Sequence, residues 1–243
     1  MSAPLLKIEG LCGGYGALQV LFDVTLSVGA GEIVALMGSN GAGKTTTLRT
    51  VVGLLKPTGG HVHYEDADVT GIAPDLLVRK GIVLVPEGRG MLRDLTVEEN
   101  LTLGAVTVKD RSSVPGRMQQ AFDTFPILFE RREQKAGTLS GGQQQMLALG
   151  RALMSGPKLM LVDEASLGLS PVMTETAFNL LKKVNEQQGV AVLIVEQNVL
   201  ALDLADRAYI LEKGQIVNEA VGAEVRTMQG RLREAYLGKA AAS

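Results

Sequence analysis

The chain has 243 residues, with 24 lysines and arginines against 26 aspartates and glutamates, and a net charge of −2. This length fits one large domain, or a core with a sub-domain, that buries a sizeable core without disulfides. The charge balance argues against a basic nucleic-acid-binding domain and leaves a local basic patch as the alternative, so no nucleic-acid partner is expected. The single cysteine, Cys12, excludes an internal disulfide and favours a reducing compartment. No apolar run approaches the length of a membrane span, so a partner must carry the spans if the protein works at a membrane.

The N-terminal part of the chain is expected to form an antiparallel β layer. Leu5 to Leu11 is predicted as a short strand, and Gly13 to Gly16 as a turn. Apolar residues alternate within Val20 to Val28, which predicts a second strand, and Ile33 to Met37 predicts a third. Tyr15 lies in the predicted turn, and two interpretations stay open: it stacks on a nucleotide base, or it is a surface aromatic.

The stretch after the third strand has the G-x-x-x-x-G-K-[ST] spacing of a phosphate-binding loop. A helix is predicted directly after it, over Thr47 to Val52. Glycines let successive N–H groups converge on phosphate oxygens, and the helix N-terminus adds the positive end of its dipole. A glycine-rich turn without a ligand is the alternative. The loop comprises Gly38, Ser39, Asn40, Gly41, Ala42, Gly43, Lys44, Thr45 and Thr46.

The region after this helix returns to strands. His61 to Tyr64 is predicted as a strand, and Pro74 to Lys80 as a short helix. His61 and His63 offer too few ligands for a metal, so we interpret them as strand-surface residues. Ile82 to Val85 is an all-apolar run suited to a buried parallel strand, and it ends in a loop with one carboxylate, Glu87.

The middle of the chain is predicted to be a helical insertion. Thr96 to Glu99 form a capping box that opens a helix through about Val106, and Val108 to Gly116 is predicted as a loop. Arg117 to Gln134 is amphipathic, with Pro126 as an interruption. Ser140 to Gln143 form a second capping box, which opens a helix through about Met154.

The last third alternates strands and helices again. We predict strands over Leu159 to Val162, Val190 to Val195, Tyr209 to Leu211 and Ile216 to Val217. A helix from Pro171 to Gln188 is capped by Ser170 and stopped by Gly189, and a short helix follows Asn198. Val225 to Leu237 predicts a terminal helix, and Lys239 to Ser243 a frayed tail.

Alternating strands and helices imply parallel pairing, which brings the carboxyl ends of four strands to one edge of a sheet. That edge would carry Lys44, Thr45, Glu87, Asp163, Glu164 and Gln197. Lys44 would reach the β- and γ-phosphates, while Thr45 and Asp163 would hold Mg²⁺. Glu164 can orient and deprotonate a water; the alternative for two adjacent acids is a solvated turn.

The stretch Leu139-Ser140-Gly141-Gly142-Gln143 can be read locally as a well-capped helix or as an anion-binding helix N-terminus. It also matches the signature sequence of the ATP-binding cassette family. Together with the loop at Gly38 and the Asp163-Glu164 pair, nearly the whole chain resembles an ABC ATPase. The resemblance implies a head-to-tail dimer in which Ser140 and Gly142 close over the ATP on the partner's phosphate loop. It also implies Tyr15 as the adenine-stacking residue.

The fold implied by the resemblance is α/β: a P-loop NTPase ABC cassette with a RecA-like core, an antiparallel β sub-domain and an inserted helical sub-domain. Residues 1–86 would form the β sub-domain and the first part of the core. Residues 87–155 would form the helical sub-domain, residues 156–220 the second part of the core, and residues 221–243 a C-terminal helix and tail.

Four features depart from the common family pattern. Glu87 stands where the family usually has Gln, Gln197 where it has His, and Ala165 where Pro is common. The stretch from Gln197 to Asp206 is one residue shorter than expected. A Gln amide donates to a phosphate but carries no proton charge near neutral pH. Glu87 can still reach Mg²⁺ or a water, which makes it a third candidate metal ligand beside Thr45 and Asp163.

Two of these departures narrow the resemblance. The stretches around Pro86-Glu87-Gly88, Ser166 to Pro171 and Glu196-Gln197-Asn198 are similar to LivF-type ATPase subunits of branched-chain amino-acid importers. In that subfamily Glu87 and Gln197 belong to the pattern, so they need not mean inactivity. Ala165 and the shortened stretch stay unexplained by it.

The resemblance implies an ATPase that powers import of branched-chain or other hydrophobic amino acids from the cytoplasmic face of the membrane. Its partners would be a second ATPase subunit, identical or not, two permease subunits and, indirectly, an extracytoplasmic solute-binding protein. A groove near Glu87 and the helical insertion would receive the permease. Alternatives are a urea or amide importer, a lipid exporter, a soluble ABC-type switch and a regulatory subunit without turnover. An isolated monomer should bind ATP yet hydrolyse it poorly.

Overall fold

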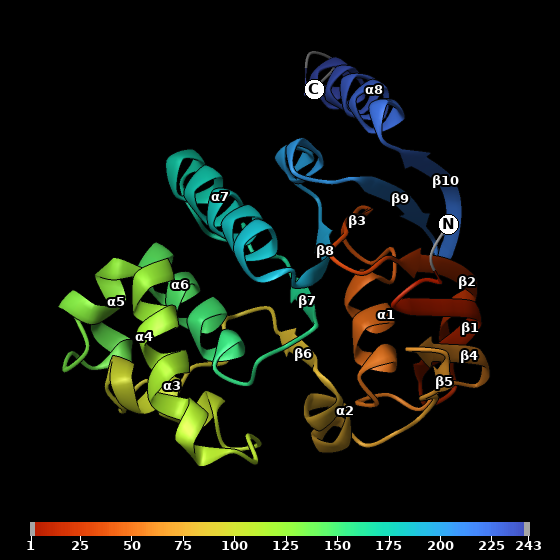
Figure 1. Ribbon diagram of the computed structural model, residues 1–243. Coiled ribbons are helices and arrows are strands. Elements are labelled where there is room, and N and C mark those ends of the chain that lie inside the picture. The colour runs from red at the N-terminus through yellow and green to blue at the C-terminus, as the bar shows by residue number, and fades with distance from the viewer. Residues whose placement is uncertain (1–2, 241–243) are drawn as a thin grey trace.

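Two β-sheets form the centre of the molecule in a computed structural model that describes residues 3–240, with side chains as far as Leu232 (Figure 1). The first sheet is antiparallel, in the order β2-β1-β4-β5. It comprises β1 (Leu6–Tyr15), β2 (Leu18–Val28), β4 (Gly59–Tyr64) and β5 (Ala67–Asp68). The second has the order β10-β9-β3-β8-β7-β6. It comprises β3 (Ile33–Met37), β6 (Ile82–Val85), β7 (Leu159–Asp163), β8 (Ala191–Glu196), β9 (Arg207–Glu212) and β10 (Gln215–Val221).

The second sheet is parallel from β9 to β6, and only β10 runs antiparallel to its neighbour. Every residue of β3, β7 and β8 is buried, as expected for strands with both faces covered. In this register Met37 pairs with Glu196, and Asp163 pairs with Val195. The predicted meeting of carboxyl ends at one sheet edge is therefore confirmed.

Helices cover both faces of the parallel sheet, which divides the core in two. α1 (Lys44–Val51) contributes Leu48 and Val51 to a core shared by both sheets. α7 (Pro171–Gln188) contributes Phe178 and Leu181 to a second core on the opposite face. This division fits the alternation of strands and helices, because each crossover helix must bury its apolar stripe against the sheet. The remaining helices outside the insertion are α2 (Pro74–Lys80) and α8 (Ala223–Ala240).

Four helices of the insertion gather to one side of the molecule, apart from α1 and the antiparallel sheet (Figure 1). They are α3 (Val97–Gly104), α4 (Val114–Thr124), α5 (Pro126–Glu130) and α6 (Gly141–Leu153). Both predicted capping boxes are present, at Thr96 and at Ser140. Leu101, Phe125 and Leu128 are fully buried in the core that joins these helices to the sheet. Three short 3₁₀ turns complete the elements: η1 (Arg111–Ser113), η2 (Ala136–Thr138) and η3 (Val199–Asp203).

The predicted turn at Gly13 to Gly16 is wrong, because β1 continues as far as Tyr15. Gly13 pairs with Leu21 and Gly14 with Gln19 across an irregular register. A Cβ on Gly14 would overlap the Leu18 carbonyl. Gly14 therefore serves close strand approach, and the chain reverses only after Tyr15, where Gly16 has φ of 58°.

Other boundaries also differ from prediction. The predicted loop over 108–116 already contains the start of α4, where Pro115 occupies the first turn. The predicted short helix after Asn198 is the 3₁₀ turn η3. Lys239 belongs to α8, while the last three residues of the predicted tail lie outside the described residues. The helices within residues 3–240 include none with an apolar stretch that could span a bilayer.

Candidate functional site

The loop between β3 and α1 has the backbone that a phosphate-binding loop needs. Gly41 and Gly43 have φ of 79° and 112°, conformations that side chains rarely adopt. A Cβ on Gly38 would lie 2.5 Å from the Leu211 carbonyl oxygen, so this position has no room for a larger residue. The loop thus packs against β9 on one side, and its Gly41 is open on the other.

Lys44 is held across this loop by its own backbone. Its Nζ donates to the carbonyl oxygens of Gly38, at 2.9 Å, and Ser39, at 3.1 Å. The same Nζ lies 3.2 Å from Oε1 of Glu164, and the Lys44 side chain is only 4% exposed. A buried ammonium with fixed acceptors is pre-positioned for an anion at the mouth of the loop.

The hydroxyl oxygen of Thr45 and a carboxylate oxygen of Asp163 lie next to each other. The Thr45 hydroxyl donates to Oδ1 of Asp163 at 3.0 Å, although 118 residues separate the two positions. Burial raises the pKa of Asp163, and the negative charges of Glu87 and Glu164 add to the rise, while the Thr45 hydrogen bond opposes it. Hard oxygen donors with further carboxylates nearby are the donor set that Mg²⁺ prefers.

Glu164 follows β7 in a left-handed conformation, with φ of 47°. Its N–H donates to the Val195 carbonyl at 3.0 Å, which ties the turn to β8. A proline restricts the residue before it to extended conformations, so the buried Ala165 permits a backbone that proline would disfavour. This accounts for Ala165, which the family pattern left unexplained.

Gln197 joins the phosphate loop to the acidic pair. Its Nε2 donates to Oδ1 of Asn40 at 2.6 Å and to Oε1 of Glu164 at 3.1 Å. Glu164 is thereby held between a lysine ammonium and a glutamine amide. The 3₁₀ turn η3 follows Gln197 and Asn198, and Asp206 then rejoins β3 by accepting the Ile33 N–H at 2.9 Å.

Glu196 is a residue of this site that sequence reasoning missed. It is 1% exposed and accepts the N–H and the hydroxyl of Ser166, both at 2.8 Å. Burial raises its pKa, and these hydrogen bonds lower it. It therefore fixes the segment after Glu164 against the end of β8. The only signal in the sequence is a carboxylate that directly follows six apolar residues.

Tyr15 stands at the end of β1, beside the start of α1. Its ring is exposed, and its hydroxyl accepts from Arg49 at 3.3 Å and from Thr46 at 3.5 Å. The structure thus brings Tyr15 to the phosphate loop, with its apolar ring accessible. An accessible aromatic next to a phosphate-binding loop suits stacking of a planar base.

Ser140 and Gly142 are not brought to the phosphate loop of the same chain. Ser140 is exposed at the N-terminus of α6, where its hydroxyl accepts the Gln143 N–H at 3.4 Å. Gly142 is buried against Met173 of α7. Figure 1 shows α6 within the helical group, apart from α1. The predicted site is therefore split into two surfaces of this chain.

Glu87 is exposed in the loop after β6, and the described residues show no hydrogen bond from it to Thr45 or Asp163. It acts on Asp163 through its charge. The same loop contains a contact that the sequence did not predict: Nη1 of Arg89 donates to Oε1 of the buried Gln144 at 2.9 Å. Gln144 in turn donates to the Leu139 carbonyl at 3.1 Å. The Glu87 loop is thus tied directly to α6.

Comparison with known proteins agrees with this geometry. The ABC transporter family matches residues 21–167. The chain is 46% identical to a high-affinity branched-chain amino acid transport ATP-binding protein, BraG, of Pseudomonas aeruginosa, over 96% of this chain and 100% of that protein. It is 38% identical to a probable branched-chain amino acid transport ATP-binding protein, LivF, of Archaeoglobus fulgidus, over 87% of this chain and 90% of that protein.

A solved structure has the same fold. It is a dimeric post-hydrolysis state of the ATP-binding cassette MJ0796 bound to ADP and Pi, with a TM-score of 0.77 and 27% identity. The match covers 89% of this chain and 98% of that chain. This chain has relatives that are ATP-binding subunits of transporters. It also contains the phosphate loop, the Asp163-Glu164 pair and the signature sequence at the N-terminus of α6. The chain belongs to the ABC transporter family, as one of its ATPase cassettes.

Proposed function

We propose that this chain hydrolyses ATP to power the import of branched-chain or other hydrophobic amino acids through partner membrane proteins. The observation that carries the ATPase part is the placement of Glu164 between Lys44 and Gln197 at the phosphate loop. The choice of solute rests on the similarity to BraG and LivF. Solute specificity itself resides on other chains of the transporter.

The nucleotide would bind with its base on Tyr15 and its phosphates on the backbone of Gly38 to Thr46. Thr45 and Asp163 would hold Mg²⁺, and the exposed Glu87 would reach it through water. When bound, Mg²⁺ supplies positive charge that neutralises the phosphate oxygens. Lys44 would move from Glu164 to the phosphates, since a phosphate offers it a stronger acceptor.

Hydrolysis would depend on Glu164 as the general base that takes a proton from the attacking water. Release of Lys44 from Glu164 would free the carboxylate for this role. Gln197 would donate from Nε2 to the terminal phosphate, in place of its present acceptor Asn40. The contacts seen among these side chains would therefore be exchanged for contacts to nucleotide and water.

The complete site would need a second ATPase subunit, identical or different. The separation of Ser140 and Gly142 from this chain's phosphate loop supports that arrangement, as does the dimeric cassette among the similar structures. In a head-to-tail dimer, the exposed N-terminus of α6 would meet the terminal phosphate bound on the partner. An exposed helix N-terminus, capped by a serine whose hydroxyl can still donate a hydrogen bond, suits that anion.

A hollow of about 290 Å³ between β6, α3 and α6 is the proposed docking site for a permease segment. Its apolar lining includes Leu92, Leu103 and Val106, which are 50%, 41% and 63% exposed. Exposed apolar side chains of this size mark an interaction surface. The hollow adjoins the loop of Glu87 and Arg89, so docking there could sense the nucleotide site.

A basic hollow of about 370 Å³ borders this groove and shares Val78 and Ser155 with it. Among the described residues, no carboxylate forms an ion pair with Arg79, Lys80 or Lys109 on its rim. The permease segment is therefore proposed to combine an apolar face with acidic residues beside it. The chain would then sit at the cytoplasmic face of the membrane, held by its two permease partners.

The predicted division of the chain remains a proposal. The position of helices α3 to α6 supports a helical sub-domain over residues 87–155, because all four lie within that range. Residues 1–86 and 156–220 would share the parallel sheet, because each contributes strands to it. Residues 221–243 would add α8 and the tail.

Transport by the native assembly tests the proposal. The complex is isolated from its host's membranes through a tag on this chain and reconstituted in vesicles that contain ATP. Uptake of labelled leucine, isoleucine and valine is expected to require ATP and the external solute-binding protein. Uptake of urea or an amide instead, or outward movement of lipid, would replace the amino-acid proposal. Recovery of this chain without membrane partners would favour a soluble switch.

A further inference from the structure

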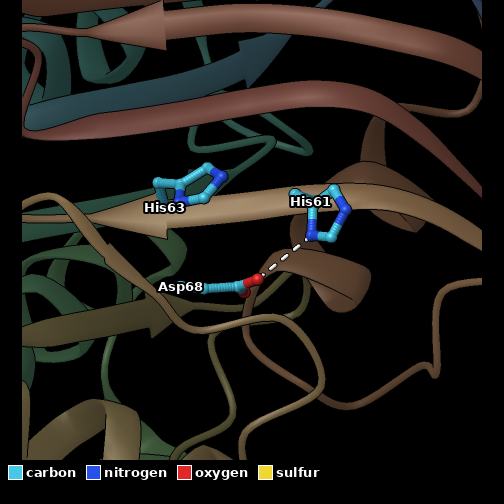
Figure 2. A group of neighbouring side chains, drawn as sticks. All are labelled: His61, His63 and Asp68. Carbon is cyan, nitrogen blue, oxygen red and sulfur yellow. Dashed lines mark hydrogen bonds and ion pairs between the residues drawn. The ribbon is translucent and has the colours of Figure 1, made fainter.

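We propose a site for a divalent transition metal, of the Zn²⁺ class, formed by His61, His63 and Asp68 on the open face of the antiparallel sheet (Figure 2). One ligand atom from each residue lies within 4.8 Å of the other two. The two histidines alone were too few for a metal, and the structure supplies the third ligand from the next strand. The site is independent of the ATP-binding residues and of the proposed transport.

The strand geometry places the three side chains together. His61 and His63 are two residues apart on β4, so they share one face, while Val62 and Tyr64 between and beside them are buried on the other. Asp68 on β5 pairs directly with His63 across the ladder. The ring centroids of the histidines are 5.9 Å apart, and Figure 2 shows the carboxylate of Asp68 beside them.

The distances fit a small coordination shell after modest rotation of exposed side chains. Tetrahedral Zn²⁺ holds nitrogen and oxygen ligands at about 2.0–2.2 Å, which places ligand atoms roughly 3.3 Å from one another. Nδ1 of His61 and Oδ2 of Asp68 are already 3.0 Å apart. The side chains of His61 and Asp68 are 63% and 48% exposed, so they are free to turn toward an ion and leave a position for water.

Neighbouring groups orient two of the three ligands. The N–H of Thr70 donates to Oδ1 of Asp68 at 2.8 Å, which leaves Oδ2 facing His61. Oε2 of Glu9 on β1 lies 3.3 Å from Nε2 of His63, and Lys7 neutralises the other oxygen of Glu9 at 2.6 Å. A carboxylate on the second nitrogen of a histidine orients the ring for a metal on the first. Glu9 is therefore an outer partner.

The ligand set selects the class of ion. Two imidazole nitrogens with one carboxylate suit Zn²⁺, Ni²⁺ or Cu²⁺, whereas Mg²⁺ and Ca²⁺ require oxygen ligands. The β4–β5 hairpin is short, since β5 has only two residues. An ion shared by β4 and β5 would tie this hairpin together. Binding to the folded chain would therefore also raise its thermal stability.

Calorimetric titration of ZnCl₂ into the untagged, nucleotide-free full chain tests the proposal, with Cys12→Ser as background to remove the one thiol. His61 and His63 are the only histidines in the chain, so any histidine-dependent binding must occur at this site. Asp68→Asn is compared with Asp66→Asn, which removes the same charge from the same hairpin. Circular dichroism checks that each variant is folded.

The expected result is one saturable Zn²⁺ per chain, with a higher melting temperature. His61→Ala, His63→Ala and Asp68→Asn should each weaken binding about tenfold or more, while Asp66→Asn leaves it unchanged; Glu9→Gln should weaken it by about 10- to 100-fold. X-ray absorption of the Zn²⁺ complex should show imidazole ligands. Unsaturable binding, or unchanged affinity in both histidine variants, would overturn the proposal.

Discussion

Replacement of Glu164 by Gln should retain ATP binding and nearly stop turnover. The change preserves side-chain size but removes the carboxylate that accepts a proton from water. It also removes the charge that pairs with Lys44 at 3.2 Å, where both side chains are largely buried, at 4% and 11% exposed. Lys44 keeps its two carbonyl acceptors, Gly38 and Ser39, so the phosphate loop should stay intact.

The expected loss can be stated as a rate. A positioned general base raises the rate of the chemical step by about 10²- to 10⁴-fold, which corresponds to lowering the activation free energy by roughly 3–5 kcal/mol. Steady-state release of phosphate by the assembled transporter measures turnover, and a fluorescent ATP analogue measures affinity. The affinity should be equal or higher, because one negative charge near the phosphates is removed.

A matched control separates the role of this carboxylate from a general change of charge. Glu175→Gln alters an exposed glutamate on α7 and should leave both turnover and affinity unchanged. A fall of less than about tenfold in Glu164→Gln would refute the base assignment. Loss of ATP binding would instead refute the claim that Lys44 is positioned independently of Glu164.

Three further outcomes are expected. Gln197→His should retain at least part of the ATPase activity, since both side chains donate to a phosphate; complete loss would refute the donor-only role of Gln197. Glu196 has a raised pKa, so its ionised form is disfavoured in the folded protein, and its contribution to stability falls as pH rises through that pKa. The free energy of unfolding in urea is measured for wild type and Glu196→Gln between about pH 4 and 8. The value for Glu196→Gln minus the value for wild type should become more positive as pH rises, and a difference that stays constant would contradict this. Gly38→Ala should lower the free energy of unfolding by about 1–3 kcal/mol because of the Leu211 carbonyl, whereas Gly116→Ala, where the helix leaves open space, should not lower it; equal effects would be inconsistent with a packing cause.

The local sequence pattern of apolar and capping residues was sufficient to predict the strands and helices that position the site residues. The predicted strand over Ile82 to Val85 and the helix from Pro171 to Gln188 have the observed bounds. Buried apolar runs and helix caps determine such segments within a few residues. Parallel pairing then fixes which strand ends meet, so the neighbourhood of Lys44 and Asp163 followed from topology.

Side-chain partners distant in sequence could not be predicted in this way. Gln197 and Asn40 are 157 residues apart, and no spacing rule links a glutamine amide to that carbonyl. The same holds for Arg89 with Gln144, 55 residues apart, whose contact depends on how the helical group lies on the sheet. Gly14 misled the prediction, because glycine serves close strand approach as readily as a turn.

The dependence of ATP hydrolysis on assembly tests the central claim most directly. Turnover per chain is measured for the isolated monomer, verified by light scattering, and for the membrane complex at the same ATP concentration. Because Ser140 and Gly142 lie away from the phosphate loop of their own chain, the monomer should bind ATP but hydrolyse it far more slowly than the complex. A monomer that hydrolyses ATP as fast as the complex would contradict a site completed by a second subunit.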